Sequence, residues 1–99
     1  MNVTLSRTEI EVEKTLTGFL RTVDFADRLW ARSDHGHITF WLLTKPVSHE
    51  EEREVYEANS RINRYVRDAR YSFFVINPEM YEEPFAFEPP IGATEIPFR

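Results

Sequence analysis

A long amphipathic helix that leads into an apolar strand is the feature of this sequence that most constrains its fold. Residues 48–68 carry apolar side chains at helical spacing. Ser48, with Glu51 three residues later, predicts a capping box at the start of this helix. The strand 71–76 is apolar on both faces, whereas a strand with one face in water alternates apolar and polar residues. A partner subunit, a ligand or the chain's own tail must therefore cover its second face.

The preceding residues predict the other elements of an α+β fold. Apolar residues at helical spacing predict a helix over about 8–22. Residues 28–33 and 37–44 read as a hairpin around a short loop containing Gly36. Residues 2–5 alternate weakly and leave a first strand open. The order (β)αββαβ predicts a two-layer sandwich in which an antiparallel sheet carries two helices on one face, either ferredoxin-like or as a three-stranded variant.

The chain changes character after residue 77. Five of its six prolines lie between Pro78 and Pro97, which argues against regular helix there. Apolar residues nevertheless recur, so a solvated tail is not expected. We predict an α+β domain over 1–77 and a Pro-rich extended arm over 78–99. The sequence leaves open whether this arm docks on its own domain or on another molecule.

Two strands of the predicted sheet are apolar on both sides, and the helices cover only one side. In the strand 37–44, Phe40 and Leu42 share one face while Trp41 shares the other with Leu43. Leaving large apolar side chains in water forgoes about 1.5–3 kcal/mol each. The predicted interaction surface therefore combines the open sheet face with the alternating apolar residues of the arm. Its residues are Trp41, Leu43, Phe74, Ile76, Phe85, Phe87, Ile96 and Phe98.

Composition removes several classes of function. The 99 residues include no cysteine, which excludes disulfides, thiolate catalysis and cysteine-ligated metals. A net charge of −5 disfavours nucleic acid as a partner. No signal peptide is recognisable, and no apolar run approaches the roughly 20 residues of a membrane span. We expect a cytoplasmic protein without a membrane partner and without a cofactor.

Charged and titratable clusters provide few candidate sites. Arg64, Arg67 and Arg70 are candidate contacts for an anion or a protein partner, although a solvated helix face explains the same pattern. Asp34 and the neighbouring histidines His35 and His37 have metal-ligating side chains, but such residues are common in exposed turns. We therefore predict no metal site. The sequence carries no nucleophile-elbow, P-loop or dinucleotide-binding motif, and we assign no catalytic residue.

These observations favour a non-catalytic protein-interaction module, a small homodimer that uses its sheet face and its arm to bind itself or a partner protein. The alternative is a small-molecule-binding protein or cofactor-free enzyme. It requires a cavity lined by Trp41, Tyr71, Phe73 or Phe74, with His37 or an arginine at its mouth. Nucleic-acid binding through the arginines of the second helix is a third hypothesis, which predicts steep salt dependence.

Overall fold

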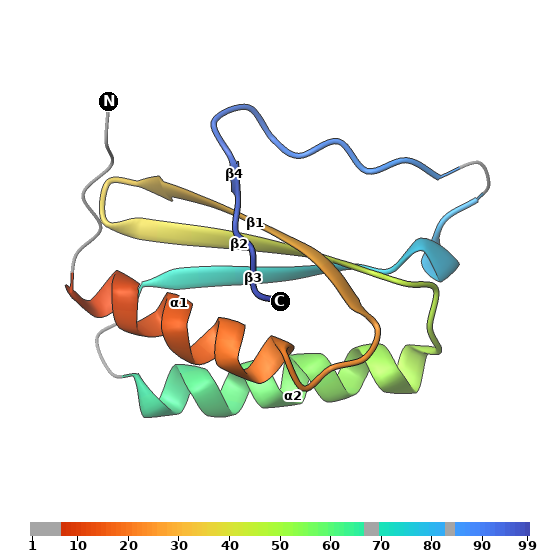
Figure 1. The fold of residues 1–99 in the computed structure, drawn as a ribbon, viewed down its shortest axis with the longest axis horizontal. Coiled ribbons are helices and arrows are strands. Elements are labelled where there is room, and N and C mark those ends of the chain that lie inside the picture. Colours follow the sequence, from red (N-terminus) through yellow and green to blue (C-terminus); the bar gives the residue numbers. More distant parts are fainter. Residues whose placement is uncertain (1–6, 67–69, 83–84) are drawn as a thin grey trace.

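The structure, a computed structural model, describes residues 7–66, 70–82 and 85–99. Both helices lie on the same side of a four-stranded sheet, and the C-terminal segment runs over the opposite side (Figure 1). The predicted α+β class is therefore confirmed. The elements in chain order are α1 (Arg7–Leu20), β1 (Ala26–Asp34), β2 (His37–Thr44), α2 (His49–Tyr65), β3 (Tyr71–Ile76), a 3-10 turn η1 (Pro78–Met80) and β4 (Thr94–Glu95).

The sheet is mixed, with strand order β3-β2-β1-β4. β1 pairs antiparallel with β2 and β4, whereas β2 and β3 run parallel. The prediction of an antiparallel sheet is therefore wrong. α2 carries the chain from the end of β2 back to the start of β3, and adjacent strands joined by such a crossover are parallel. The strand proposed for residues 2–5, on which the ferredoxin-like alternative depended, lies outside the described residues.

α2 begins as the sequence predicts. The Ser48 Oγ accepts a hydrogen bond from the Glu51 N–H (3.2 Å), and the Glu51 carboxylate accepts one from the Ser48 N–H (3.3 Å). This capping box satisfies two backbone donors that the first turn would leave free. The helix ends at Tyr65, earlier than predicted, and Val66 has an extended backbone. Its buried residues Val55, Ala58 and Ile62 face the sheet.

The hairpin of β1 and β2 is confirmed, and its turn is shorter than the predicted loop. Asp34 pairs with His37, so only His35 and Gly36 form the connection. Both have positive φ, 50° and 80°. This is the conformation of a two-residue type I′ turn, in which glycine is favoured because it has no Cβ. The tight turn fixes the pairing register, and hence which side chains face the helices.

One hydrophobic core lies between the sheet and the helices. β1, β2 and β3 each contribute alternate residues to it, as half-buried strands do. α1 contributes Val12, Leu16 and Leu20, four residues apart along one face. Phe98, the second-to-last residue, joins the same core. The buried core residues are Val12, Leu16, Leu20, Ala26, Leu29, Ala31, Ile38, Phe40, Leu42, Val55, Ile62, Val66, Phe73, Val75 and Phe98.

Asn77 joins the end of β3 to the loop that precedes α2. It is 1% exposed. Its Oδ1 accepts hydrogen bonds from the N–H groups of Val47 (3.1 Å) and Glu79 (3.2 Å). Its Nδ2 donates to the Val47 carbonyl (2.8 Å) and, at 3.4 Å, to the Glu52 carboxylate. A buried amide that uses both its donor and its acceptor fixes the relative position of these segments.

Candidate functional site

The face of the sheet that points away from the helices carries a row of aromatic residues. Strand pairing aligns Trp30 of β1 with Trp41 of β2, and Trp41 with Phe74 of β3. Because side chains alternate along each strand, all three project from this open face. Leu43 and Ile76 are also cross-strand neighbours, and both are partly exposed on the same face. The sequence-based prediction of a doubly apolar sheet therefore has a structural counterpart.

Coverage of this aromatic row falls from one end to the other. Trp30 is 5% exposed, with the ring of Phe87 from the arm at 5.2 Å between centroids. Trp41 is partly exposed, and the guanidinium of Arg32 lies 5.6 Å from its ring centroid. Phe74, on the edge strand β3, is 48% exposed. The arm thus covers the β1 side of the open face and leaves the β3 side accessible.

Arginine side chains attach the arm to the rest of the chain. Arg28 forms a bidentate pair with Glu95, at 2.9 Å through Nε and 2.6 Å through one terminal nitrogen. Arg32 donates to the Ile91 carbonyl (3.2 Å), and Arg21 donates to the Phe98 carbonyl (2.8 Å). In the single chain the arm therefore docks on its own domain, passing over the open face and then down past β1 to the helical layer (Figure 1).

The pairing of Arg28 with Glu95 changes the titration of both groups. The hydrogen bond from Arg28 lowers the pKa of the Glu95 carboxyl, because it stabilises the ionised form. The hydrogen bond to Glu95 likewise raises the pKa of Arg28. Both side chains are largely exposed, so solvent screens the pair and its contribution to stability is small. The bidentate geometry positions β4 against β1 rather than supplying much free energy.

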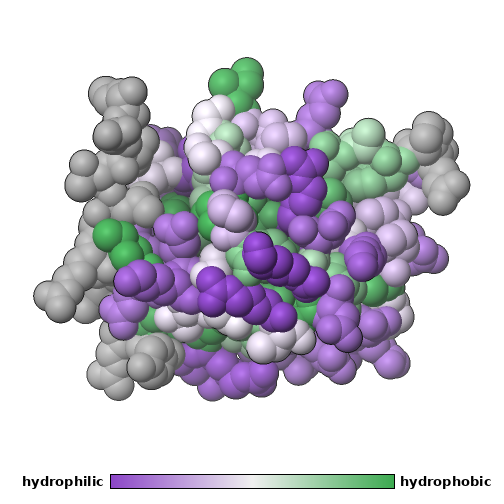
Figure 2. Space-filling model, in the orientation of Figure 1, coloured by the Kyte–Doolittle hydropathy of each residue, from purple (hydrophilic) through white to green (hydrophobic). Residues whose placement is uncertain are grey.

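The other arm residues of the predicted interaction surface do not lie together: Phe85 lies in the first part of the arm, whereas Ile96 and Phe98 pack at the hydrophobic core. Phe85 is half-buried and stacks on Tyr81, with ring centroids 4.6 Å apart. Ile96 is half-buried against the core, and Phe98 is 5% exposed within it. Phe85 and Phe87 precede the turn of the arm at Ile91 and Gly92, whereas Ile96 and Phe98 follow it. Apolar patches reach the surface along the arm, while hydrophilic residues dominate the helical layer (Figure 2).

The arginines of the second helix do not gather into a described site. Arg64 is exposed near the end of α2, and Arg70 is exposed just before β3. Arg67 lies outside the described residues. Within the described part of the chain, neither Arg64 nor Arg70 forms a salt bridge to a carboxylate. The structure therefore leaves the predicted anion or partner contact at these arginines as a prediction.

The residues proposed to line a small-molecule cavity are divided between two faces of the sheet. Tyr71 and Phe73 point to the helical layer, whereas Trp41 and Phe74 point to the open face. His37 hydrogen-bonds the Ser72 hydroxyl at 2.9 Å, and His35 lies 3.3 Å from Asp34. Among the described residues, no group of three or more metal-ligating side chains comes together. These four aromatic side chains thus line no common cavity.

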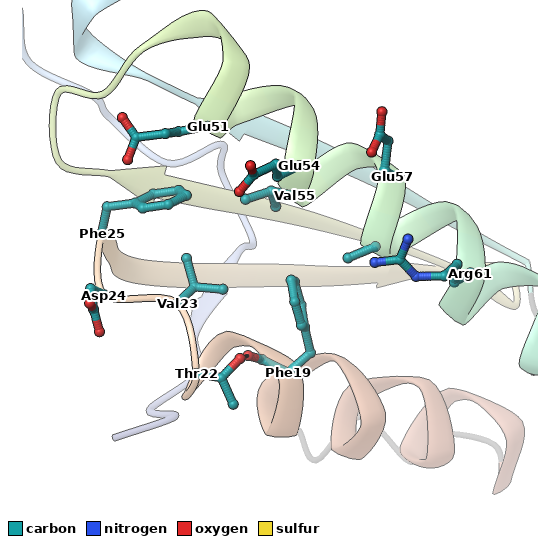
Figure 3. A pocket seen from close by; sticks show the side chains of 11 residues that line it. Phe19, Thr22, Val23, Asp24, Phe25, Glu51, Glu54, Val55, Glu57 and Arg61 are labelled. Atoms are coloured by element: carbon teal, nitrogen blue, oxygen red, sulfur yellow. Dashed lines mark hydrogen bonds between the residues drawn. The ribbon is translucent and has the colours of Figure 1, made fainter.

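A groove that sequence reasoning missed lies between the helices (Figure 3). It has a volume of about 490 Å³ and opens to solvent. Its apolar lining comes from the end of α1, from the turn that follows it, and from buried residues of α2. No local sequence pattern indicates it, because its lining is assembled from two segments that are distant in the sequence. The apolar lining residues are Phe19, Val23, Phe25, Val55 and Ala58, and the charged ones are Asp24, Glu51, Glu54, Glu57 and Arg61.

The groove is negatively charged, because four carboxylates and one guanidinium are among its lining side chains. Glu51 is engaged in the capping box of α2. Within the described chain, the carboxylates of Asp24, Glu54 and Glu57 make no ion pair. An apolar floor with an unneutralised acidic rim suits a ligand that combines an apolar body with a positive charge.

Among the described residues, neither α1 nor α2 has the length and hydrophobicity of a membrane-spanning segment. No family model matches the sequence, and neither a curated protein nor a solved structure is detectably similar to it.

Proposed function

We propose that the protein is a non-catalytic interaction module that forms a homodimer at the β3 side of its sheet, where the open face remains accessible. The observation that carries this proposal is Phe74, which is 48% exposed at the uncovered end of the row Trp30–Trp41–Phe74. Aromatic residues are enriched at protein interfaces, where they bury large area at little cost in side-chain entropy. The arm restricts the accessible part of this face to the side nearest β3.

We place the protein in the cytoplasm, since a chain without cysteine needs no oxidising compartment.

The homodimer is tested by the mass of the protein in solution. Multi-angle light scattering and sedimentation velocity on the full chain, over a range of micromolar concentrations, are expected to show a dimer. Phe74→Ser is expected to shift the protein to monomer while leaving its fold intact, because the ring contributes to an interface more than to the core. Ile91→Ser is the matched control, since Ile91 is 96% exposed on the arm. A monomer at every concentration, or a dimer that Phe74→Ser leaves unchanged, would overturn the proposal.

The groove between the helices supports a second candidate function, the binding of a small cationic ligand with an apolar body. It rests on the three unpaired carboxylates around an apolar floor of ligand-binding size. We expect an arylalkylamine such as 4-phenylbutylamine to shift the NMR signals of Val23 and Phe25. The double substitution Glu54→Gln with Glu57→Gln should weaken this binding. Absence of shifts at millimolar amine would rule the groove out as such a site.

A further inference from the structure

Among the described residues, β3 is an edge strand of the sheet, and no strand lies on its outer side. The Ile38 N–H donates to the Arg70 carbonyl (3.1 Å), which sets the phase of the parallel ladder. In that phase the N–H groups of even-numbered residues of β3 point to β2. The N–H and C=O groups of Tyr71, Phe73 and Val75 therefore point away from the sheet. They form a row of donors and acceptors of the kind that another strand can pair with.

A single side chain engages this row within the described residues. The Val75 N–H donates to the Tyr56 hydroxyl (3.0 Å), and the Tyr56 ring meets the Phe73 ring edge to face at 6.3 Å between centroids. Tyr56 is itself 37% exposed. The hydroxyl therefore occupies one position of the edge from the solvent side, and it can rotate away without opening the core.

The charged residues of α2 that border this edge lie before Tyr56, at Glu52 and Arg53, whereas β3 and the part of α2 from Tyr56 to Asn63 carry uncharged side chains on this side. β3 has the sequence YSFFVI, with no charged residue, no proline and no glycine. Charged residues and proline commonly protect natural edge strands from pairing with another strand. On α2, the exposed residues that continue along the helix from Tyr56 are Ser60 and Asn63, both uncharged. In a chain with 29% charged residues, such a surface meets a copy of itself without repulsion between like charges.

We infer that a second copy of the chain adds its own β3 to this edge, antiparallel and related by a two-fold axis at Phe73. In this register Phe73 pairs with Phe73 of the second copy, and Tyr71 pairs with Val75. All three outward residues of each copy then exchange hydrogen bonds, about six in total. A two-fold contact is self-complementary, so the same edge serves both copies.

This pairing rests on the proposed homodimer and specifies its geometry. Ser72 of one copy lies opposite Phe74 of the other, on the open face. The two Phe74 rings therefore approach each other diagonally across the junction and lose exposed surface. The sheets become continuous, and the open faces of both copies join into one surface. Tyr56 regulates the contact, because its hydroxyl must release the Val75 N–H before the second strand can bind.

The Tyr56 hydroxyl provides the first test. Tyr56→Phe removes the competing acceptor and is expected to lower the dimer dissociation constant about tenfold, since each copy no longer gives up a hydrogen bond. Tyr71→Phe is the matched control. Its hydroxyl also bonds to α2, at Asn59 Oδ1 (2.9 Å), but touches no outward backbone group. Equal dissociation constants for Tyr56→Phe and the unmodified protein would contradict edge pairing.

Amide hydrogen exchange locates the contact in the unmodified protein. The N–H groups of Tyr71 and Phe73 are expected to exchange rapidly in dilute monomer and to become protected as the dimer forms. The inward N–H groups of Ser72 and Phe74 should be protected at all concentrations. Outward amides that stay unprotected while the mass doubles would overturn the inference and leave the proposed homodimer standing.

The register is tested by disulfide trapping, for which a chain without cysteine is well suited. Arg70 lies opposite Ile76 of the second copy, as a non-hydrogen-bonded pair with Cα atoms about 4.5 Å apart. The double variant Arg70→Cys with Ile76→Cys should therefore cross-link on mild oxidation. Each single variant should not, because equivalent residues lie about 20 Å apart, six residues at about 3.3 Å. A dimer without this cross-link refutes the register, whereas a monomer refutes the homodimer itself.

Discussion

Replacing Phe98 by alanine tests whether the last residues of the arm belong to the core. The residue lies in a segment without regular secondary structure, and a free segment of this kind would tolerate the change at no cost. Here the ring is 5% exposed within the core. Truncating a buried phenylalanine costs about 3–5 kcal/mol, part from lost burial and part from the cavity. Because its neighbours Pro97 and Arg99 are exposed and the segment can relax into the space, we expect about 3 kcal/mol.

Such a loss is a large fraction of the stability of a domain this size, which is about 5–15 kcal/mol. It corresponds to a fall in melting temperature of at least about 12 °C. Urea denaturation followed by fluorescence measures the free energy of unfolding directly. Ile91→Ala, at a position 96% exposed in the same arm, should change it by less than about 0.5 kcal/mol. Phe98→Leu should cost less than about 1.5 kcal/mol.

The result that would refute this reasoning is a Phe98→Ala protein as stable as Ile91→Ala. The arm would then not be held in the core of its own chain. A concentration-dependent loss would instead mean that Phe98 packs into a second copy, because the stability of an exchanged arm depends on protomer concentration.

Three further predictions concern single side chains. Asn77→Ala should cost about 1–3 kcal/mol of unfolding free energy, because it leaves the Val47 N–H and carbonyl without their partner. Asn77→Asp should cost more at neutral pH. Lowering the pH through the pKa of the new carboxyl should recover part of that lost stability. Carboxyl NMR should show the pKa of Glu95 below the ordinary glutamate value, and Arg28→Gln should restore that ordinary value. Because the folded-state pKa is depressed, the contribution of Glu95 to stability is present above the unfolded-state pKa. It is lost as the pH falls through the folded-state pKa. Ser48→Ala should cost about 1 kcal/mol of unfolding free energy and Ser48→Gly only a few tenths of a kcal/mol, because glycine is also tolerated at the N-cap. Equal losses of stability for the two variants would show that the cap is not what stabilises α2.

Local pattern was enough to place the helices and the three main strands. The capping box at Ser48 marks the start of α2, and alternation with Gly36 marks the hairpin. The strand 71–76 matches β3 at both ends. These signals are local because capping, turn conformation and side-chain alternation depend on neighbours within a few residues. The doubly apolar strands predicted that a partner, a ligand or the chain's tail covers the second sheet face, and in the structure the arm covers the β1 side of it.

Strand neighbours and the groove could not be read in the same way. An antiparallel sheet was expected, yet β3 lies beside β2 and is parallel to it. The sequence pattern of β3 is the same whichever strand it pairs with. The groove between the helices depends on how far α1 and α2 diverge above the sheet, which no single segment encodes. Of the carboxylates that line it, Glu51 already had a sufficient local explanation in the capping box at the start of α2.

The sequence by itself determined the elements, the buried stripe of α2 and the apolar character of both sheet faces. Only the tertiary structure decided that Phe98 enters the core, that Phe87 covers Trp30 and that Phe74 stays exposed at the edge. The physical reason is the range of the interactions. Helix caps, turns and alternation act within a few residues, whereas the position of the arm depends on contacts such as Arg28–Glu95 and Arg21–Phe98, between residues 67 and 77 positions apart.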